Sequence, residues 1–162
     1  MNQTKQLSLA ALFAGAITLV TAYVLHIPIP TGGYIHLGDA LIYLVACLLP
    51  TPYAIGAAVV GAGLADLLTA PMWVLPTIVI KGLIVLFFTS KQPRILCPHN
   101  MVAVVLAGIL SPIGYGIASA MMMGSVMGFI PQVLGTSLQS IGSGVVFFVL
   151  ASGFERSKVR LD

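Results

Sequence analysis

Residues 100–122 read NMVAVVLAGILSPIGYGIASAMM, and this stretch decides the fold. It contains no charged side chain, and an α-helix needs only about 20 mostly apolar residues to cross a bilayer. The same character extends through the whole chain, in which 59% of the residues are hydrophobic and 7% are charged. Because soluble domains carry about 25% charged residues, we expect an integral membrane protein.

Apolar runs separated by proline, glycine and charged residues predict six α-helices. We expect all six to be transmembrane helices of one all-α domain that comprises residues 1–162, with a short second helix. The predicted helices are residues 5–26, 37–49, 52–69, 72–90, 100–122 and 130–154.

The basic residues flank the apolar runs in a pattern that predicts orientation. With six crossings, the basic residues before the first helix, between the fourth and fifth, and after the sixth all fall on one side. The positive-inside rule assigns that side, and therefore both termini, to the cytoplasm. The loops on the other side contain no lysine or arginine. The basic residues concerned are Lys5, Lys91, Arg94, Arg156, Lys158 and Arg160.

Several function classes lack their sequence signatures. The chain has neither the glycine-rich phosphate loop of nucleotide hydrolases nor a dinucleotide-binding fingerprint. We therefore expect no enzyme and no cofactor, and any energy for transport would come from an ion gradient or a separate subunit. No spacing of cysteine and histidine suits a four-ligand metal site, and the basic residues read as topology signals, so we expect no nucleic-acid binding.

Three charged side chains fall within or at the margin of the predicted helices: Asp39, Asp66 and Lys81. Ionisable groups are costly inside a bilayer, so each is a candidate functional residue. Lys81 can reach outward to the level of Asp66, which predicts a structural ion pair between the third and fourth helices. The alternative is that Lys81 contacts a ligand.

A second group of candidates lies at the outer ends of the predicted helices. Asp39 begins the second helix, where a carboxylate caps free amides or, with Tyr34 and His36, binds a polar ligand. Trp73, at the start of the fourth helix, belongs either to an interfacial aromatic belt or to the wall of a pocket for a flat ring.

Polar side chains in the last two helices predict a stripe that lines a cavity. Two of them flank a proline kink in the fifth helix, and three recur at helical spacing in the sixth. The alternative is plain hydrogen bonding between helices. The residues of this stripe are Ser111, Tyr115, Gln132, Thr136 and Gln139.

The first helix carries two parallel rows of small residues, Ala10 with Ala14 and Ala11 with Gly15. Small residues spaced by four allow two helices to approach closely. Near the cytoplasmic end, such a surface could dock another membrane subunit.

Three stretches resemble a known family. They are residues 33–44 (GYIHLGDALIYL), 65–67 (ADL) and 73–82 (WVLPTIVIKG). The chain resembles the S component, the substrate-binding membrane subunit, of an energy-coupling factor (ECF) vitamin transporter of the riboflavin, hydroxymethylpyrimidine and pyridoxine group. The resemblance is strongest over residues 31–90, and that family also has six transmembrane helices.

This resemblance implies a function without enzymatic chemistry. An S component of the bacterial plasma membrane captures a vitamin or precursor outside the cell, docks on a coupling subunit that carries two ATPases, and topples to release its cargo inside. Ala10 and Ala14 would provide the docking surface. The pocket would include Tyr34, Trp73, Lys81, Tyr115 and Gln132.

Two other functions stay open at this point. A stand-alone transporter would use Asp39, Asp66 and Lys81 as a proton relay, and would move substrate without any other subunit. An intramembrane enzyme would use His36 and Asp39 as acid and base, but no further catalytic residues accompany them.

Overall fold

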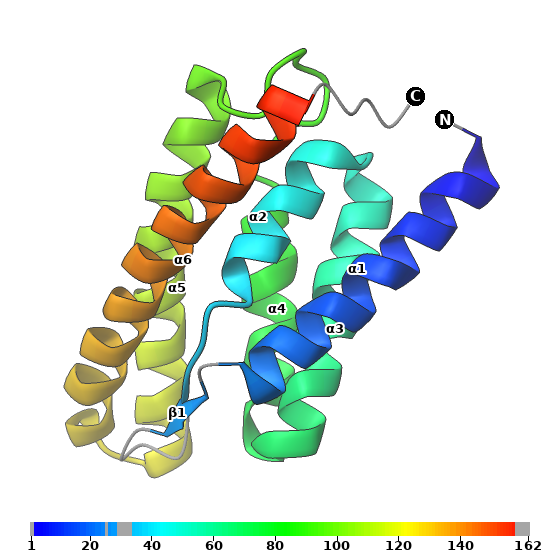
Figure 1. Ribbon diagram of the computed structural model, residues 1–162. Helices are drawn as coiled ribbons and strands as arrows, with labels where there is room; N and C mark the ends of the chain where they lie inside the picture. Colours follow the sequence, from blue (N-terminus) through cyan, green and yellow to red (C-terminus); the bar gives the residue numbers. More distant parts are fainter. Residues whose placement is uncertain (1, 25, 29–33, 158–162) are drawn as a thin grey trace.

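The computed structural model describes residues 2–24, 26–28 and 34–157, and within these residues the chain forms six α-helices (Figure 1). This confirms the all-α class and the number of helices. A two-stranded antiparallel hairpin follows the first helix. The elements are α1 (Gln3–Tyr23), β1 (Ile27–Pro28), β2 (Tyr34–Ile35), α2 (Asp39–Leu48), α3 (Thr51–Thr69), the 3-10 turn η1 (Pro71–Trp73), α4 (Val74–Val85), α5 (Pro98–Met123), the 3-10 turn η2 (Val126–Gly128) and α6 (Phe129–Ser157).

Local sequence explains several helix ends. The side chain of Asn2 accepts a hydrogen bond of 2.9 Å from the backbone N–H of Lys5 and so caps α1. α5 has Pro98 in its first turn, where the missing N–H would be unpaired in any case. The same helix ends at Gly124, whose φ of 60° is favourable for glycine.

Two helices end several residues earlier than predicted, and α2 is one to two residues shorter at each end. α1 ends at Tyr23 and not at residue 26, because the chain turns there into the hairpin that contains Pro28. α4 ends at Val85 and not at residue 90. After Val85 the apolar sequence continues, but the backbone N–H groups of Leu86 and Phe87 bond to carbonyls three residues earlier, which tightens the chain into turns.

The bundle has two outer pairs of helices and two short central helices. α5 packs along α6 and α1 packs along α3, while α2 and α4 lie between the pairs (Figure 1). α2 contacts α1, α3, α4 and α6, and eight of its ten residues are buried. The side chains of α2 therefore meet residues from most of the bundle.

Small residues let the outer pairs approach closely. At Gly61 of α3, a Cβ atom would lie 2.7 Å from the backbone oxygen of Ala14 in α1. At Gly116 of α5, it would lie 2.6 Å from a methyl group of Val133 in α6. Since a real Cβ atom cannot be that close, glycine is required at both contacts.

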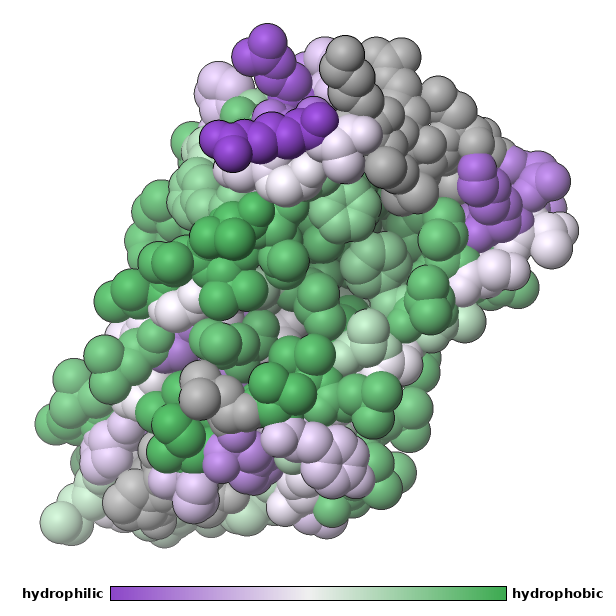
Figure 2. All heavy atoms as spheres, viewed as in Figure 1, coloured by the Kyte–Doolittle hydropathy of each residue, from purple (hydrophilic) through white to green (hydrophobic). Residues whose placement is uncertain are grey.

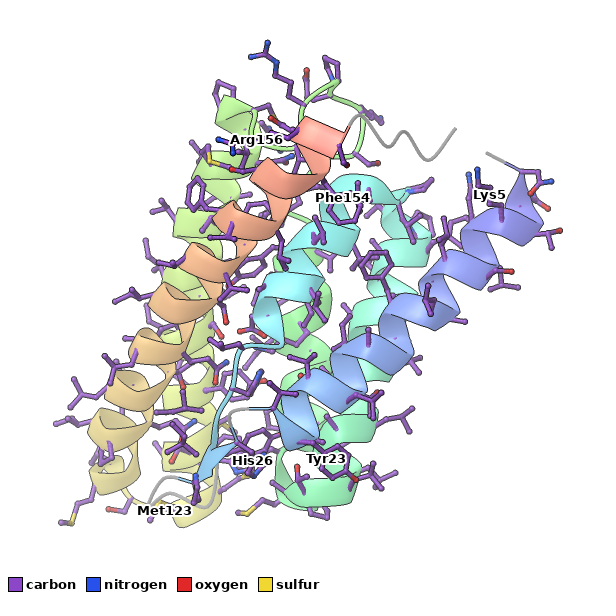
Figure 3. All side chains as sticks on the ribbon, viewed as in Figure 1. Lys5, Tyr23, His26, Met123, Phe154 and Arg156 are labelled. Atoms are coloured by element: carbon purple, nitrogen blue, oxygen red, sulfur yellow. The ribbon has the colours of Figure 1, made fainter. Side chains whose placement is uncertain are left out.

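On the face shown in Figure 2, an apolar band separates two more polar ends. Lys5 and Arg156 lie at one end, whereas His26 and Met123 lie at the opposite end (Figure 3). Large exposed side chains such as Leu12, Val79 and Leu134 are 60–69% exposed in the isolated chain. An apolar belt of this kind is typical of a protein whose sides face lipid.

Four of the helices, α1, α3, α5 and α6, are long and apolar enough to cross a bilayer. α2 has 10 residues and α4 has 12, so at 1.5 Å per residue they measure only about 15–18 Å. The chain is a multi-pass membrane protein. Residues 29–33 of the predicted outer loop, and Lys158 and Arg160 of the basic C-terminus, lie outside the described residues.

Candidate functional site

A cavity that is partly open to solvent lies among the helices and the hairpin, with about 300 Å³ of empty space when the open part is included. Its lining comes from β2, the adjoining residue His36, α3, η1, α4, α5 and α6, so segments far apart in sequence meet there. The lining residues are Tyr34, His36, Asp66, Trp73, Thr77, Tyr115, Gln132, Thr136 and Gln139.

Aromatic rings form much of the cavity wall. Trp73 and Tyr115 have ring centroids 5.7 Å apart. His26, which directly precedes strand β1 of the hairpin, stacks on Tyr34 with a centroid distance of 3.9 Å. Since Tyr34 contacts His26, the cavity lies toward the end of the molecule that is opposite Lys5 and Arg156 (Figure 3). Trp73, Tyr115 and Tyr34 thus give the cavity an aromatic surface, which suits a ring-shaped ligand.

Asp66 is the acidic residue of the cavity lining. Its Oδ1 accepts a hydrogen bond of 2.5 Å from the hydroxyl of Tyr34, and only 5% of the residue is exposed. Its Oδ2 is buried without a hydrogen-bond partner among the described residues. The Thr77 hydroxyl lies beside this carboxylate and also shares a hydrogen bond of 2.7 Å with the hydroxyl of Tyr115, in which either group can be the donor.

Trp73 presents the complementary unpaired group. The indole Nε1–H is buried and has no acceptor among the described residues. Indole nitrogen is a donor only, so a buried Trp normally finds an acceptor. The cavity lining thus contains one carboxylate oxygen that lacks a donor and one N–H that lacks an acceptor.

A fully buried ion pair lies behind the cavity. Lys81 Nζ is 2.8 Å from Asp39 Oδ1 and donates a hydrogen bond of 2.9 Å to Oδ2 of the same carboxylate. Gln139 donates a second hydrogen bond of 3.0 Å to Oδ2. The ammonium group also lies 5.0 Å from the ring centroid of Tyr115. The pair therefore joins α2, α4 and α6 directly.

This geometry corrects the expected pairing of Lys81 with Asp66. The prediction considered only α3 and α4, which are neighbours in sequence, but α2 also packs against α4 and places Asp39 within reach of Lys81. Asp66 pairs with the Tyr34 hydroxyl instead. The partners of the Asp39 side chain are Lys81 and Gln139, so its role extends beyond capping α2.

His36 connects the hairpin to this network. The ring Nδ1 of His36 accepts a hydrogen bond of 3.0 Å from the backbone N–H of Gly38. The backbone N–H of His36 donates a hydrogen bond of 3.4 Å to Gln139 Oε1. Burial lowers the pKa of His36 to about 4, with Asp39 opposing that shift. Burial, together with the Asp66 carboxylate, raises the pKa of Tyr34 well above its usual value. At neutral pH both side chains are uncharged.

The predicted site residues fall into two groups. Seven of the ten line the cavity: Tyr34, His36, Trp73, Tyr115, Gln132, Thr136 and Gln139. The other three, Asp39, Lys81 and Ser111, are buried and lie outside the lining. Asp39 reaches the cavity through its hydrogen bond with Gln139, whereas the Ser111 hydroxyl has no partner among the described residues.

Two lining residues were not predicted as binding residues. Thr77 received no role, and Asp66 was assigned only to an ion pair. A spacing of four residues could have indicated Thr77, because Trp73, Thr77 and Lys81 follow one face of a helix. No local signal marks Asp66 as a cavity residue, since its neighbour Tyr34 belongs to a different segment.

The small residues of α1 face two directions. Ala10 and Ala14 are 7% and 8% exposed and belong to the side of α1 that packs on α3. They are therefore not available in this structure as the expected docking surface. Ala11 and Gly15 are exposed, and nothing lies within 4 Å of a Cβ atom placed on Gly15. The accessible row of small residues is the second one.

Comparison with known proteins gives two findings. Residues 1–156 match the model of a family described as the S component of ECF-type riboflavin transporters. A protein of Pyrococcus woesei, described as "Uncharacterized protein in gap 3'region", is 41% identical over 103 residues. That match covers 59% of this chain and 66% of the relative, just under two thirds of the relative's length.

Proposed function

Because the chain belongs to the S-component family of ECF-type riboflavin transporters, a family of transporter subunits and not of enzymes, we propose that it captures a vitamin or vitamin precursor for import. The observation that supports this function best is the cavity of aromatic and polar side chains toward the end opposite Lys5 and Arg156. Two buried polar atoms of its lining, Asp66 Oδ2 and Trp73 Nε1, form no hydrogen bond with the residues that the structure describes, as in a site that awaits a ligand.

In the proposed topology the chain crosses the plasma membrane six times, and both termini lie in the cytoplasm. Lys5, Lys91, Arg94 and Arg156 then face inward, as the positive-inside rule requires. α2 and α4 are too short to cross alone, so their flanking turns complete the two crossings within the protein. Irregular backbone is tolerated at this depth where protein or a cavity surrounds it.

The proposed cargo is a compound of the pyridoxine, hydroxymethylpyrimidine or riboflavin class. Trp73, Tyr115 and Tyr34 would hold its ring, and Gln132, Thr136 and Gln139 would provide hydrogen bonds. Small-molecule pockets have volumes of about 300–1,000 Å³, and the enclosed part of this cavity is smaller than that. Its small size favours a single ring over the three fused rings of riboflavin.

Transport would require partners. In the proposed complex, the exposed Ala11 and Gly15 row of α1 packs on a transmembrane coupling subunit that carries two ATPases. The absence of large side chains in this row lets a partner helix come close. Reorientation of the loaded subunit in the membrane would then release the cargo inside.

Uptake into vesicles tests whether transport requires the coupling subunit and its ATPases. Vesicles that contain this protein alone should bind the vitamin without accumulating it, and co-reconstitution with a coupling subunit and its ATPases should produce ATP-dependent uptake. Mass spectrometry of the protein purified in mild detergent identifies the retained ligand. Accumulation driven by a proton gradient in vesicles with this protein alone would instead establish a stand-alone secondary transporter.

Bulky substitutions on α1 test the docking surface. Ala11→Trp and Gly15→Trp should abolish ATP-dependent uptake and leave ligand affinity unchanged, because neither residue contacts the cavity. The matched control is Val105→Trp, on the exposed side of α5, which should leave uptake intact. Normal uptake by both α1 variants would show that the partner docks elsewhere.

A further inference from the structure

We infer that Asp66 and Trp73 select the cargo of this transporter subunit. The cargo is a single aromatic ring with an amine or amino group that donates N–H hydrogen bonds. It also has an acceptor for the indole N–H of Trp73, and it carries no phosphate. This inference rests on the proposed function and specifies the chemistry that the cavity accepts. It is based on which polar atoms of the lining are already paired and which are not.

The charged groups in and near the cavity determine which ligands it accepts. The cavity lining includes one carboxylate, Asp66, and contains neither lysine nor arginine. The nearby cation, Lys81, is 0% exposed and is held by Asp39 at 2.8 Å, so its charge is already matched. His36 is uncharged at neutral pH because burial lowers its pKa to about 4. The cavity therefore offers no positive charge to an anion.

Asp66 provides the acceptor. Its Oδ2 forms no hydrogen bond among the described residues and the Thr77 hydroxyl lies beside the carboxylate, while Oδ1 already accepts from Tyr34. An unpaired buried polar group costs about 1–3 kcal/mol, and more when it is charged. A ligand amine or amino group would satisfy Oδ2. A ligand phosphate would lie beside this carboxylate without a cation, so it would be repelled.

Trp73 provides the donor. Within the described part of the chain, its buried Nε1–H has no acceptor, and Trp73 is only 2% exposed. A ring nitrogen or an oxygen substituent of the ligand can accept this hydrogen bond. The two unpaired groups belong to different elements, α3 and η1, yet both residues line the one cavity. A ligand with both a donor and an acceptor would satisfy the two at once.

The experiment compares matched compounds by isothermal titration with the full-length protein in detergent. The first pair is pyridoxamine and pyridoxine, which differ by an amine in place of a hydroxyl. The second pair is 4-amino-5-hydroxymethyl-2-methylpyrimidine and its 4-hydroxy analogue. Pyridoxamine 5′-phosphate tests the exclusion of phosphate, and riboflavin serves as the three-ring compound.

In at least one pair, the wild type should bind the amino compound about ten- to a hundredfold more tightly than the hydroxyl compound, the range expected for a hydrogen bond to a charged group. Asp66→Asn should remove most of this preference, and Trp73→Phe should weaken both members by about three- to tenfold. Tyr34→Phe, which keeps the carboxylate, should retain the preference and thereby controls for general damage to the cavity.

Equal affinity within both pairs, or an equal loss for both members in Asp66→Asn, would overturn the inference. Tight binding of the phosphate ester would do the same. If riboflavin binds and neither pair does, the proposed function stands and this inference fails. If neither riboflavin nor any single-ring compound binds to folded protein, the proposed function fails with it.

Discussion

The regions around Asp39 and Asp66 treat a buried carboxylate in opposite ways. Asp39 is fully buried, faces Lys81 at 2.8 Å and accepts a further hydrogen bond from Gln139. Asp66 has no cation beside it: Oδ1 accepts a hydrogen bond from the Tyr34 hydroxyl, the Thr77 hydroxyl lies beside the carboxylate, and Oδ2 forms no hydrogen bond among the described residues. The first arrangement holds three helices together, whereas the second leaves bonding capacity for another molecule. Substitutions in the two regions should therefore have different consequences.

The largest expected effect is on the Asp39 side. Lys81→Met keeps most of the side-chain volume but leaves the Asp39 carboxylate buried without its cation, which should destabilise the fold by about 3–5 kcal/mol. Adding Asp39→Asn should restore a large part of that loss, because no uncompensated charge remains. Unfolding of both variants in detergent measures this. A double variant no more stable than Lys81→Met would show that the ion pair is not the source of the effect.

The second expected effect is a pH dependence from His36. Its folded pKa of about 4 lies below the unfolded value of about 6.5, so the unfolded state binds the proton more readily between these values. As the pH falls from 7 to 5, the free energy of unfolding should therefore decrease by about 2 kcal/mol through His36. Above pH 7, His36 should cause no further pH dependence. The comparison is with His36→Asn, whose stability should fall less over that range. Parallel curves for the two proteins would contradict the assignment.

A smaller effect is expected at Gln139, which belongs to both regions because it lines the cavity and bonds to Asp39. Gln139→Leu should reduce stability by about 1–2 kcal/mol, since the Lys81 contact remains. Ligand affinity should fall as well. Gln139→Glu provides a sharper comparison, because a second carboxylate beside Asp39 should be worse than leucine. A variant that loses affinity without losing stability would assign Gln139 to the cavity alone.

The smallest stability effect is expected at Asp66. Asp66→Asn retains an acceptor for Tyr34, so the free energy of unfolding should change by less than about 1 kcal/mol. Thermal unfolding without ligand measures this. A loss as large as that of Lys81→Met would mean that both carboxylates serve the fold, and the contrast between the two regions would disappear.

The sequence predicts the helical class well because it depends on a strong, local signal. Each helix is a mostly apolar run, and proline, glycine or charged residues separate most of these runs. Helix ends were wrong where that signal is weak. Nothing between Leu83 and Phe88 marks the end of α4, since the whole segment is apolar.

The partner of Lys81 and the exposed row of α1 could not be predicted for a different reason. Each depends on which helix lies opposite. Asp39 and Lys81 are 42 residues apart, and only the packing of α2 against α4 brings them together. Likewise, the two rows of α1 are equally small, and Gly61 of α3 determines that Ala14 faces inward.

Much of the cavity was predicted because its polar residues are unusual in apolar helices. Gln132, Thr136 and Gln139 recur along one face of α6, and Tyr115 and Trp73 stand out among aliphatic neighbours. Asp66 was harder to place, since an acidic residue at a helix end serves many structural roles.

Trp73 allows the most direct measurement of the central claim, that this cavity is the cargo site. It is the one tryptophan of the chain and lines the cavity, so its fluorescence reports from that place alone. Titration with the ligand identified by mass spectrometry should change the emission saturably, at the same concentrations that calorimetry gives for binding. Calorimetric binding of that ligand with no change in Trp73 emission would place the site elsewhere and contradict this account.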